Sequence, residues 1–129
     1  MTVLVAYVPT PEGEAAFTAA VAEARRRGES LVLLNTPRDG GMVSTALAPE
    51  ESVRQLTSRA SAEGVEVAVR QEPHSGELAD EVVRVAGEVD ASVIVIGLRR
   101  RSPVGKLLMG STAQRILLDA DRPVLAVKP

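Results

Sequence analysis

The stretch Ser92-Val-Ile-Val-Ile-Gly97 is the most apolar run of the chain, and it decides the fold class. A short, almost continuous run of β-branched residues is typical of a strand that is covered on both faces of a sheet. Outward from it, four similar runs lie at 2–8, 31–34, 65–71 and 123–127, and four helical patterns separate the five runs. This alternation predicts an α/β fold, in which helices cover both faces of one open, doubly wound parallel sheet.

The helical patterns show a buried face and recognisable ends. Glu12 and Glu14 lie in the first turn of the first pattern, and three arginines at 25–27 precede Gly28. Acid at the start and base at the end complement the helix dipole, and glycine commonly ends a helix. Ser75 is the expected cap of the third helix. The predicted inward residues are Phe17, Ala20, Val21 and Ala24; Val53, Leu56, Thr57 and Ala60; Ala79, Val82, Val83 and Ala86; and Ala113, Ile116, Leu117 and Ala120.

Composition limits the function classes. The 129 residues fit one domain (1–129), and 45% hydrophobic with 25% charged residues is typical of a globular protein. One Phe, one Tyr and no Trp leave no aromatic platform for single-stranded nucleic acid, and the net charge of −2 does not attract polyanions. Without cysteine there is no disulfide or thiolate nucleophile. No run is long enough for a signal peptide or membrane span, so we expect a soluble cytoplasmic protein without nucleic-acid or membrane partners.

The loop that follows 92–97 has features of a phosphate site. Open parallel sheets bind ligands beyond the carboxyl ends of their strands, where the strand order reverses. Gly97 and Gly110 allow close approach of the backbone to an anion, while Ser111 and Thr112 offer donors at a helix N-terminus. Positive charge is supplied by Arg99, Arg100, Arg101 and Lys106. The alternative is a simple turn and cap beside solvated arginines, since neither a P-loop nor a GxGxxG fingerprint is present.

The segment Ala91–Lys128 resembles the carboxyl-terminal signature of the universal stress proteins. Nucleotide-binding members of that family carry a glycine, two residues, a second glycine, nine residues and then Gly-Ser or Gly-Thr. Gly97 fills the first place, 101–109 the spacer, and Gly110-Ser111 the end. The closing run at 123–127 also matches. The sequence departs from the pattern at Arg100, which stands at the second glycine, and at Val8, where the family often has an aspartate.

The resemblance implies a Rossmann-like sheet of order 3-2-1-4-5 and an adenine-nucleotide site beside the fourth strand. The ligand is then ATP or another adenine nucleotide, with Mg²⁺ as a companion ion. The expected site residues are Val8, Pro9, Thr10, Asn35, Thr36, Gly97, Arg99, Arg100, Gly110, Ser111 and Thr112. It also implies a homodimer through the last strand, which would cover an apolar edge formed by Val124, Leu125, Ala126 and Val127; burial by a helix would serve as well.

Three functions remain open at this point. The first is a stress-response protein that senses an adenylate and signals through its dimer, with any ATP hydrolysis weak and incidental. The second is a member that binds no nucleotide, with Arg100 filling the site, and acts by protein–protein interaction. The third is a small enzyme, for which no nucleophile–base pair is evident.

His74 is expected in a surface loop, and Glu12 and Glu14 are expected to serve the helix dipole rather than a magnesium ion.

Overall fold

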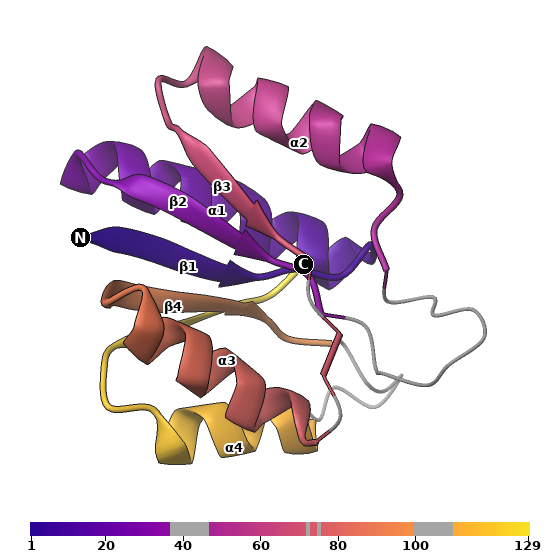
Figure 1. Cartoon of the computed structure of the whole chain (residues 1–129), viewed down its shortest axis with the longest axis vertical. Helices are drawn as coiled ribbons and strands as arrows, with labels where there is room; N and C mark the ends of the chain where they lie inside the picture. Colours follow the sequence, from indigo (N-terminus) through magenta and orange to yellow (C-terminus); the bar gives the residue numbers. More distant parts are fainter. Residues whose placement is uncertain (37–46, 72, 75, 100–109) are drawn as a thin grey trace.

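A computed structural model describes residues 1–36, 47–71, 73–74, 76–99 and 110–129. Strands and helices alternate along the chain, as the sequence predicts (Figure 1). The elements are β1 (Thr2–Ala6), α1 (Pro11–Arg27), β2 (Ser30–Leu34), α2 (Glu50–Ala62), β3 (Val67–Arg70), α3 (Leu78–Glu88), β4 (Ala91–Gly97), α4 (Ser111–Asp119) and β5 (Val124–Val127). None of the helices in these ranges is long and apolar enough to cross a membrane.

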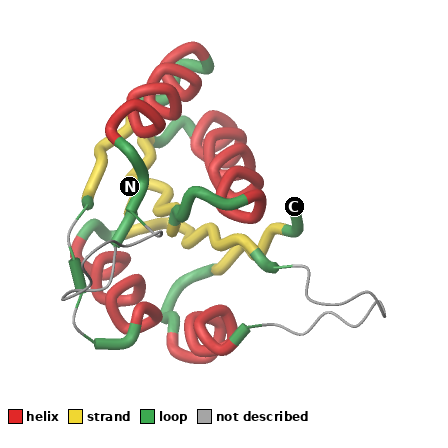
Figure 2. Tube along the Cα trace, turned by 90° about the vertical axis from the view of Figure 1, so that its right-hand side faces the viewer, coloured by secondary structure: helices red, strands yellow, loops and turns green. Residues whose placement is uncertain are grey.

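The strands form one sheet in the order β3-β2-β1-β4-β5, and every neighbouring pair is parallel. The order expected from the resemblance is therefore confirmed. It reverses between β1 and β4, where Val5 lies opposite Val95 in the register. The tube in Figure 2 shows the strands as a twisted layer with helices on both sides.

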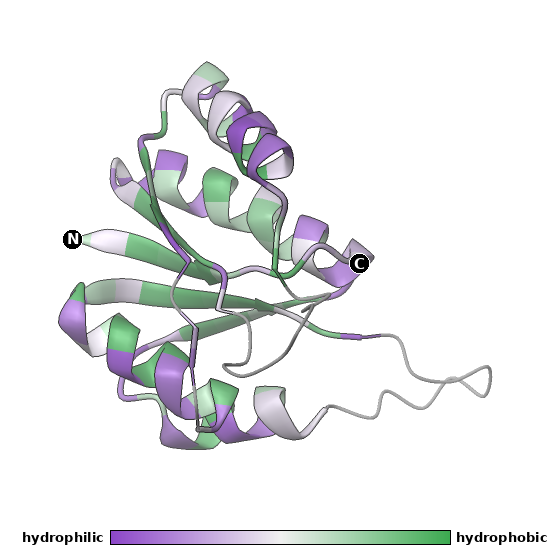
Figure 3. Cartoon of the chain, turned by 45° about the vertical axis from the view of Figure 1, so that its right-hand side comes forward, coloured by the Kyte–Doolittle hydropathy of each residue, from purple (hydrophilic) through white to green (hydrophobic). Residues whose placement is uncertain are grey.

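Alternate residues of the central strands serve two separate cores. Val3 and Val5 of β1 pack with Phe17 on the face covered by α1 and α2. Leu4 points to the other face, where it joins a cluster with Val82 of α3 and Ile116 of α4. Figure 3 shows the strands and the inner sides of the helices as apolar. Because each fully buried aliphatic side chain contributes about 1.5–3 kcal/mol, both cores hold the sheet in place.

Helix α1 begins and ends where its sequence signals predict. Thr10 is the N-cap, and its Oγ1 accepts a hydrogen bond of 3.1 Å from the backbone N–H of Gly13. Gly28 ends the helix at φ 67°, a left-handed conformation that glycine adopts without steric cost. The four predicted inward residues of α1 are all buried.

Helices α3 and α4 depart from the sequence prediction in detail. α3 begins at Leu78 with Glu77 as its N-cap, and the expected cap Ser75 lies outside the described residues. Val85 is buried in place of Val83, which lies half-buried at the margin of the apolar stripe. In α4 only Ile116 is buried; Leu117 is exposed and Ala120 lies just past the helix end.

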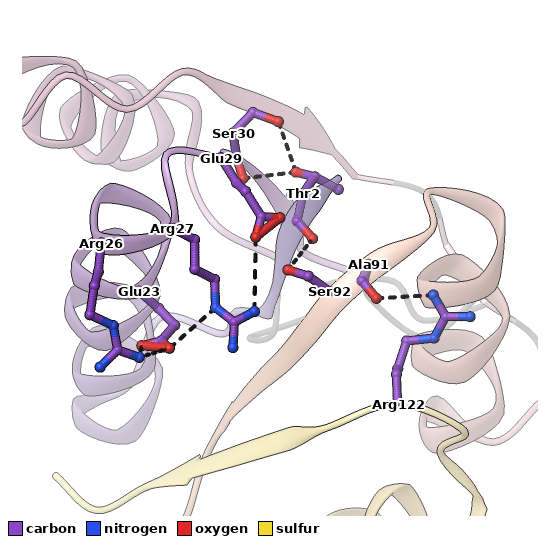
Figure 4. Close-up of polar contacts among 9 residues, drawn as sticks. All are labelled: Thr2, Glu23, Arg26, Arg27, Glu29, Ser30, Ala91, Ser92 and Arg122. Carbon is purple, nitrogen blue, oxygen red and sulfur yellow. Dashed lines mark hydrogen bonds and ion pairs between the residues drawn. The ribbon is translucent and has the colours of Figure 1, made fainter.

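Hydroxyl and guanidinium groups form hydrogen bonds at the end of the sheet where the strands begin (Figure 4). Thr2 Oγ1 donates to the Ser30 carbonyl oxygen at 2.9 Å, and Ser92 Oγ donates to the Thr2 carbonyl oxygen at 3.3 Å. Arg122 Nη1 donates to the carbonyl oxygens of Ala86 and Ala91, at 2.9 and 3.0 Å. These contacts hold the amino-terminal ends of the strands together. The candidate site lies at the other end of the sheet, beyond the carboxyl ends of the strands.

Candidate functional site

A cavity of about 370 Å³ lies beyond the carboxyl ends of β1 and β4. This is the point of strand-order reversal, where open parallel sheets bind their ligands. The described residues that line it come from the ends of β1, β2 and β4 and from α1, α3 and α4. They are Ala6, Tyr7, Val8, Glu12, Gly13, Leu34, Thr36, Leu78, Val82, Ile96, Gly97, Leu98, Arg99, Gly110, Ser111, Thr112, Ala113 and Ile116.

The first turn of α1 is wedged between the ends of the two central strands. A Cβ on Gly13 would lie 1.8 Å from the carbonyl oxygen of Val8, and a Cβ on Gly97 would lie 2.2 Å from that of Glu12. Both glycines are therefore required for close backbone packing. The prediction that Gly97 lets an anion approach the backbone is not what the structure shows, because the neighbour of Gly97 is the start of α1. Gly13 was missed, although a glycine inside a helical pattern is itself a signal of close packing.

The N-terminus of α4 forms another wall of the cavity. Gly110 is its N-cap at φ −64° and ψ 159°, and no side chain makes a capping hydrogen bond there. A Cβ on Gly110 would meet no described atom within 4 Å. The first-turn residues Ser111, Thr112 and Ala113 all line the cavity. Their backbone N–H groups cannot bond within the helix, and the dipole favours negative charge at this end. This wall can bind an anion such as a phosphate.

Other lining side chains form an apolar wall of the cavity. Ile96 ends β4, Leu78 and Val82 come from α3, and Ile116 comes from α4. Ile96, Val82 and Ile116 belong to the core between the sheet and these two helices, so the wall is held by close packing. A preformed cavity that joins apolar side chains to a few polar groups is the usual form of a small-molecule site. Ile96, Val82 and Ile116 are buried, so half-buried Leu78 supplies most of the apolar surface that this wall leaves to a ligand.

Two charged side chains line the described part of the cavity, and they are paired. The Arg99 Nε lies 3.5 Å from the Glu12 Oε1. The side chain of Glu12 is 16% exposed and that of Arg99 is 65% exposed. Arg99 was expected at the site. Glu12 was expected to serve the helix dipole, and the structure places it in the cavity wall.

Behind the cavity, Tyr7 joins a polar network between α1 and α2. Its hydroxyl donates to Glu14 Oε1 at 2.8 Å, and Arg59 Nη1 donates to Glu14 Oε2 at 2.8 Å. Burial and the hydrogen bond to Glu14 raise the pKa of Tyr7 from 10.0 to about 12. Burial raises the pKa of Glu14, but the hydrogen bonds from Arg59 and Tyr7 outweigh it, so this pKa falls below its ordinary value. The Glu14 carboxylate therefore bonds to side chains of the fold and does not face the cavity.

The chain's one tyrosine makes this network directly measurable. We expect absorbance titration at 295 nm to give a Tyr7 midpoint near 12 rather than 10.0. Because the folded pKa is raised, the associated stability is complete below pH 10 and is lost as the pH rises through 12. Glu14→Gln should move the midpoint toward 10.0, and Glu12→Gln, in the same helical turn, should move it less. A midpoint near 10.0 in the folded wild type would contradict the network.

Asn35 and Thr36 have different roles in the structure. Asn35 is buried, and its Nδ2 donates to the Tyr7 carbonyl oxygen at 2.9 Å. Its Oδ1 accepts from the Ala48 N–H at 2.9 Å and from Gln71 Nε2 at 3.0 Å. The Asn35 side chain therefore joins the ends of β1 and β3 to the segment that precedes α2.

Thr36 lines the cavity, and its Oγ1 lies 2.7 Å from Nδ1 of His74. His74 was expected to be a surface-loop residue, but it is half-buried and contacts this cavity residue. Sequence spacing gave no sign of the pairing, because the two residues belong to different loops.

The structure gathers most of the expected site residues around the cavity. Those that line it are Val8, Thr36, Gly97, Arg99, Gly110, Ser111 and Thr112. Pro9, Thr10 and Asn35 are not among the lining residues, and the Thr10 side chain caps α1. Arg100 lies outside the described residues. Within the described ranges, no group of three or more His, Cys, Asp or Glu side chains is placed to hold a metal ion.

Comparisons with known proteins agree over nearly the whole chain. The model of the universal stress protein family matches residues 1–128. A universal stress protein of Mycolicibacterium smegmatis is 38% identical over 127 residues, which cover 98% of this chain and 97% of the relative. A universal stress protein structure from Archaeoglobus fulgidus superposes with a TM-score of 0.82 at 32% identity, covering 98% of this chain and 97% of that one. The structure of an Archaeoglobus fulgidus universal stress protein in complex with dAMP gives 0.76 at 28% identity, with 98% and 96% covered.

Proposed function

Because this chain belongs to the universal stress protein family, we propose that it binds an adenine nucleotide in the cavity between the ends of β1 and β4. The observation that carries the proposal is the N-terminus of α4, which opens into the cavity at Gly110 without a capping side chain. The dAMP complex of the Archaeoglobus fulgidus protein, 28% identical over most of the chain, supports an adenylate as ligand.

In this proposal each wall binds one part of the ligand. The base packs against the apolar side of the cavity, where Leu78 is half-buried, and the phosphate accepts hydrogen bonds from the first N–H groups of α4. The role is binding rather than catalysis. Among the described lining residues there is no histidine to activate Ser111, and the Glu12 carboxylate is paired with Arg99.

Calorimetric titration of the purified chain with AMP, dAMP and ATP, with and without Mg²⁺, tests the proposal. We expect saturable heat with at least one adenylate and a matching rise in thermal midpoint, because a ligand that binds only the folded state stabilises it. No heat and no thermal shift at millimolar ligand would overturn nucleotide binding. The chain would then act as an interaction module through its protein surface.

We propose further that the chain signals as a homodimer through β5. β5 pairs with β4 on one side and ends the sheet, with Leu125 38% exposed. An open apolar edge strand is a template for pairing with another strand.

Sedimentation velocity is expected to show a dimer for the wild type and a monomer for Leu125→Lys. Val69→Lys is the matched control, because Val69 is also 38% exposed and lies on β3, the opposite edge strand. An interface at β5 would be contradicted if the Leu125→Lys protein sediments as a dimer. It would also be contradicted if the Val69→Lys protein is the only one that sediments as a monomer.

A further inference from the structure

Glu12 places a fixed negative charge in a cavity that is suited to phosphates. Its side chain is 16% exposed and lines the cavity from the first turn of α1. The backbone of this turn is wedged against Gly97, where the Glu12 carbonyl oxygen takes the space of a Cβ. The Glu12 backbone is therefore held against the end of β4, and its carboxylate projects from a fixed point in the cavity wall.

Its partner is held much less firmly. Arg99 is 65% exposed, and its Nε lies 3.5 Å from the Glu12 Oε1. An ion pair with one solvated member contributes little to stability, so the guanidinium can turn toward a bound phosphate. Arg99 would then no longer neutralise Glu12. An incoming ligand and Glu12 compete for the same guanidinium.

The repulsion that results depends on the charge of the ligand. A phosphate monoester carries about −1.5 to −2 at pH 7, and each added phosphate adds negative charge. The interaction between like charges grows with the product of the charges and is stronger in a partly buried site than in water. Magnesium reverses this effect, because it neutralises a polyphosphate and accepts carboxylate oxygens as ligands.

We propose that Glu12 is a specificity-determining residue that makes the cavity favour adenylates with one phosphate over metal-free ATP. ATP enters mainly as its magnesium complex. This inference rests on the proposed function and names the ligand class for the same site.

The test is calorimetric titration with AMP and with ATP, each in EDTA and in Mg²⁺, for four proteins. In EDTA the wild type is expected to bind AMP about tenfold more tightly than ATP. Glu12→Gln should bring the two affinities within about threefold, chiefly by improving ATP. Glu12→Asp retains the charge and should retain the preference. Mg²⁺ should improve ATP binding more in the wild type than in Glu12→Gln.

Glu14→Gln is the matched control. It removes one negative charge from the same helical turn, but its carboxylate faces Tyr7 and Arg59 rather than the cavity. It should leave the ratio of AMP to ATP affinity unchanged. Thermal unfolding of each variant checks that all four proteins are folded under the titration conditions.

The outcomes separate the two proposals. If the wild type binds AMP and Glu12→Gln leaves the ratio of affinities unchanged, or if Glu14→Gln shifts it equally, the role of Glu12 is overturned while nucleotide binding stands. If neither AMP nor ATP binds any of the four proteins, the proposed function fails and the inference fails with it.

Discussion

Gly13→Ala is expected to lower the free energy of unfolding by about 3 kcal/mol, at the upper end of what overpacking causes. The added Cβ would lie 1.8 Å from the carbonyl oxygen of Val8 and 2.9 Å from its carbon. Both are backbone atoms, so no rotamer change can relieve the overlap. The start of α1 would have to move away from β1, and the contact of Glu12 with Gly97 would move with it.

Urea unfolding followed by circular dichroism measures this effect. Gly87→Ala is the control, because Gly87 lies in the last turn of α3 and a Cβ there meets nothing within 4 Å. It should raise stability by about 0.5–1 kcal/mol, the ordinary gain of alanine over glycine within a helix. Opposite signs for the two substitutions are the expected result. A Gly13→Ala protein as stable as the wild type would show that α1 is not packed as described.

Gly110→Val is expected to weaken adenylate binding by about 100-fold or more, because each charge-assisted hydrogen bond lost contributes about 1.5–3 kcal/mol. Gly110 has a negative φ, so valine fits the backbone, and its Cβ meets no described atom within 4 Å. The side chain would occupy the space over the first turn of α4. A phosphate could then no longer reach the N–H groups of that turn.

The control for this variant is Gly76→Val. Gly76 also has open space at its Cβ position, but it is not among the residues that line the cavity. It should bind the nucleotide as the wild type does. Both variants should retain the wild-type thermal midpoint within a few degrees in the absence of ligand. In domains of about 60–100 residues, a loss of about 1 kcal/mol in the free energy of unfolding lowers the thermal midpoint by about 4–8 °C. Unchanged binding by Gly110→Val would exclude the α4 N-terminus as the phosphate site.

The fold was predictable because its signals are local and repeated. The run at 92–97 is apolar on both faces, and the structure buries it as β4, an interior strand between β1 and β5. The alternating run that contains Val69 was expected at an edge, and β3 is an edge strand. Strand order came from the family resemblance rather than from periodicity. The start of α3 was placed too early, because Ser75 looked like a cap and the register of a short helix is set by tertiary packing.

The candidate site was only partly predictable. Gly110 and Ser111 were found because a glycine before a helix start is a visible motif, and both line the cavity. The positions of Gly13 and Glu12 depend on how closely the first turn of α1 packs against the ends of β1 and β4, which no spacing along the chain encodes. Asn35 was expected beside the ligand. Its side-chain bonds to Tyr7, Ala48 and Gln71 join three segments and become visible only in the folded chain.

The hydrogen-bonded end of the sheet where the strands begin is a place at which the protein can be chemically attached to a surface without contact with its site. The turn after α4, which contains exposed Asp121 and the anchoring Arg122, lies at the opposite end of the strands from the cavity. Since the chain contains no cysteine, one cysteine introduced at Asp121 would be its sole thiol. Attachment through that thiol would immobilise every molecule in one orientation, with the cavity facing solvent.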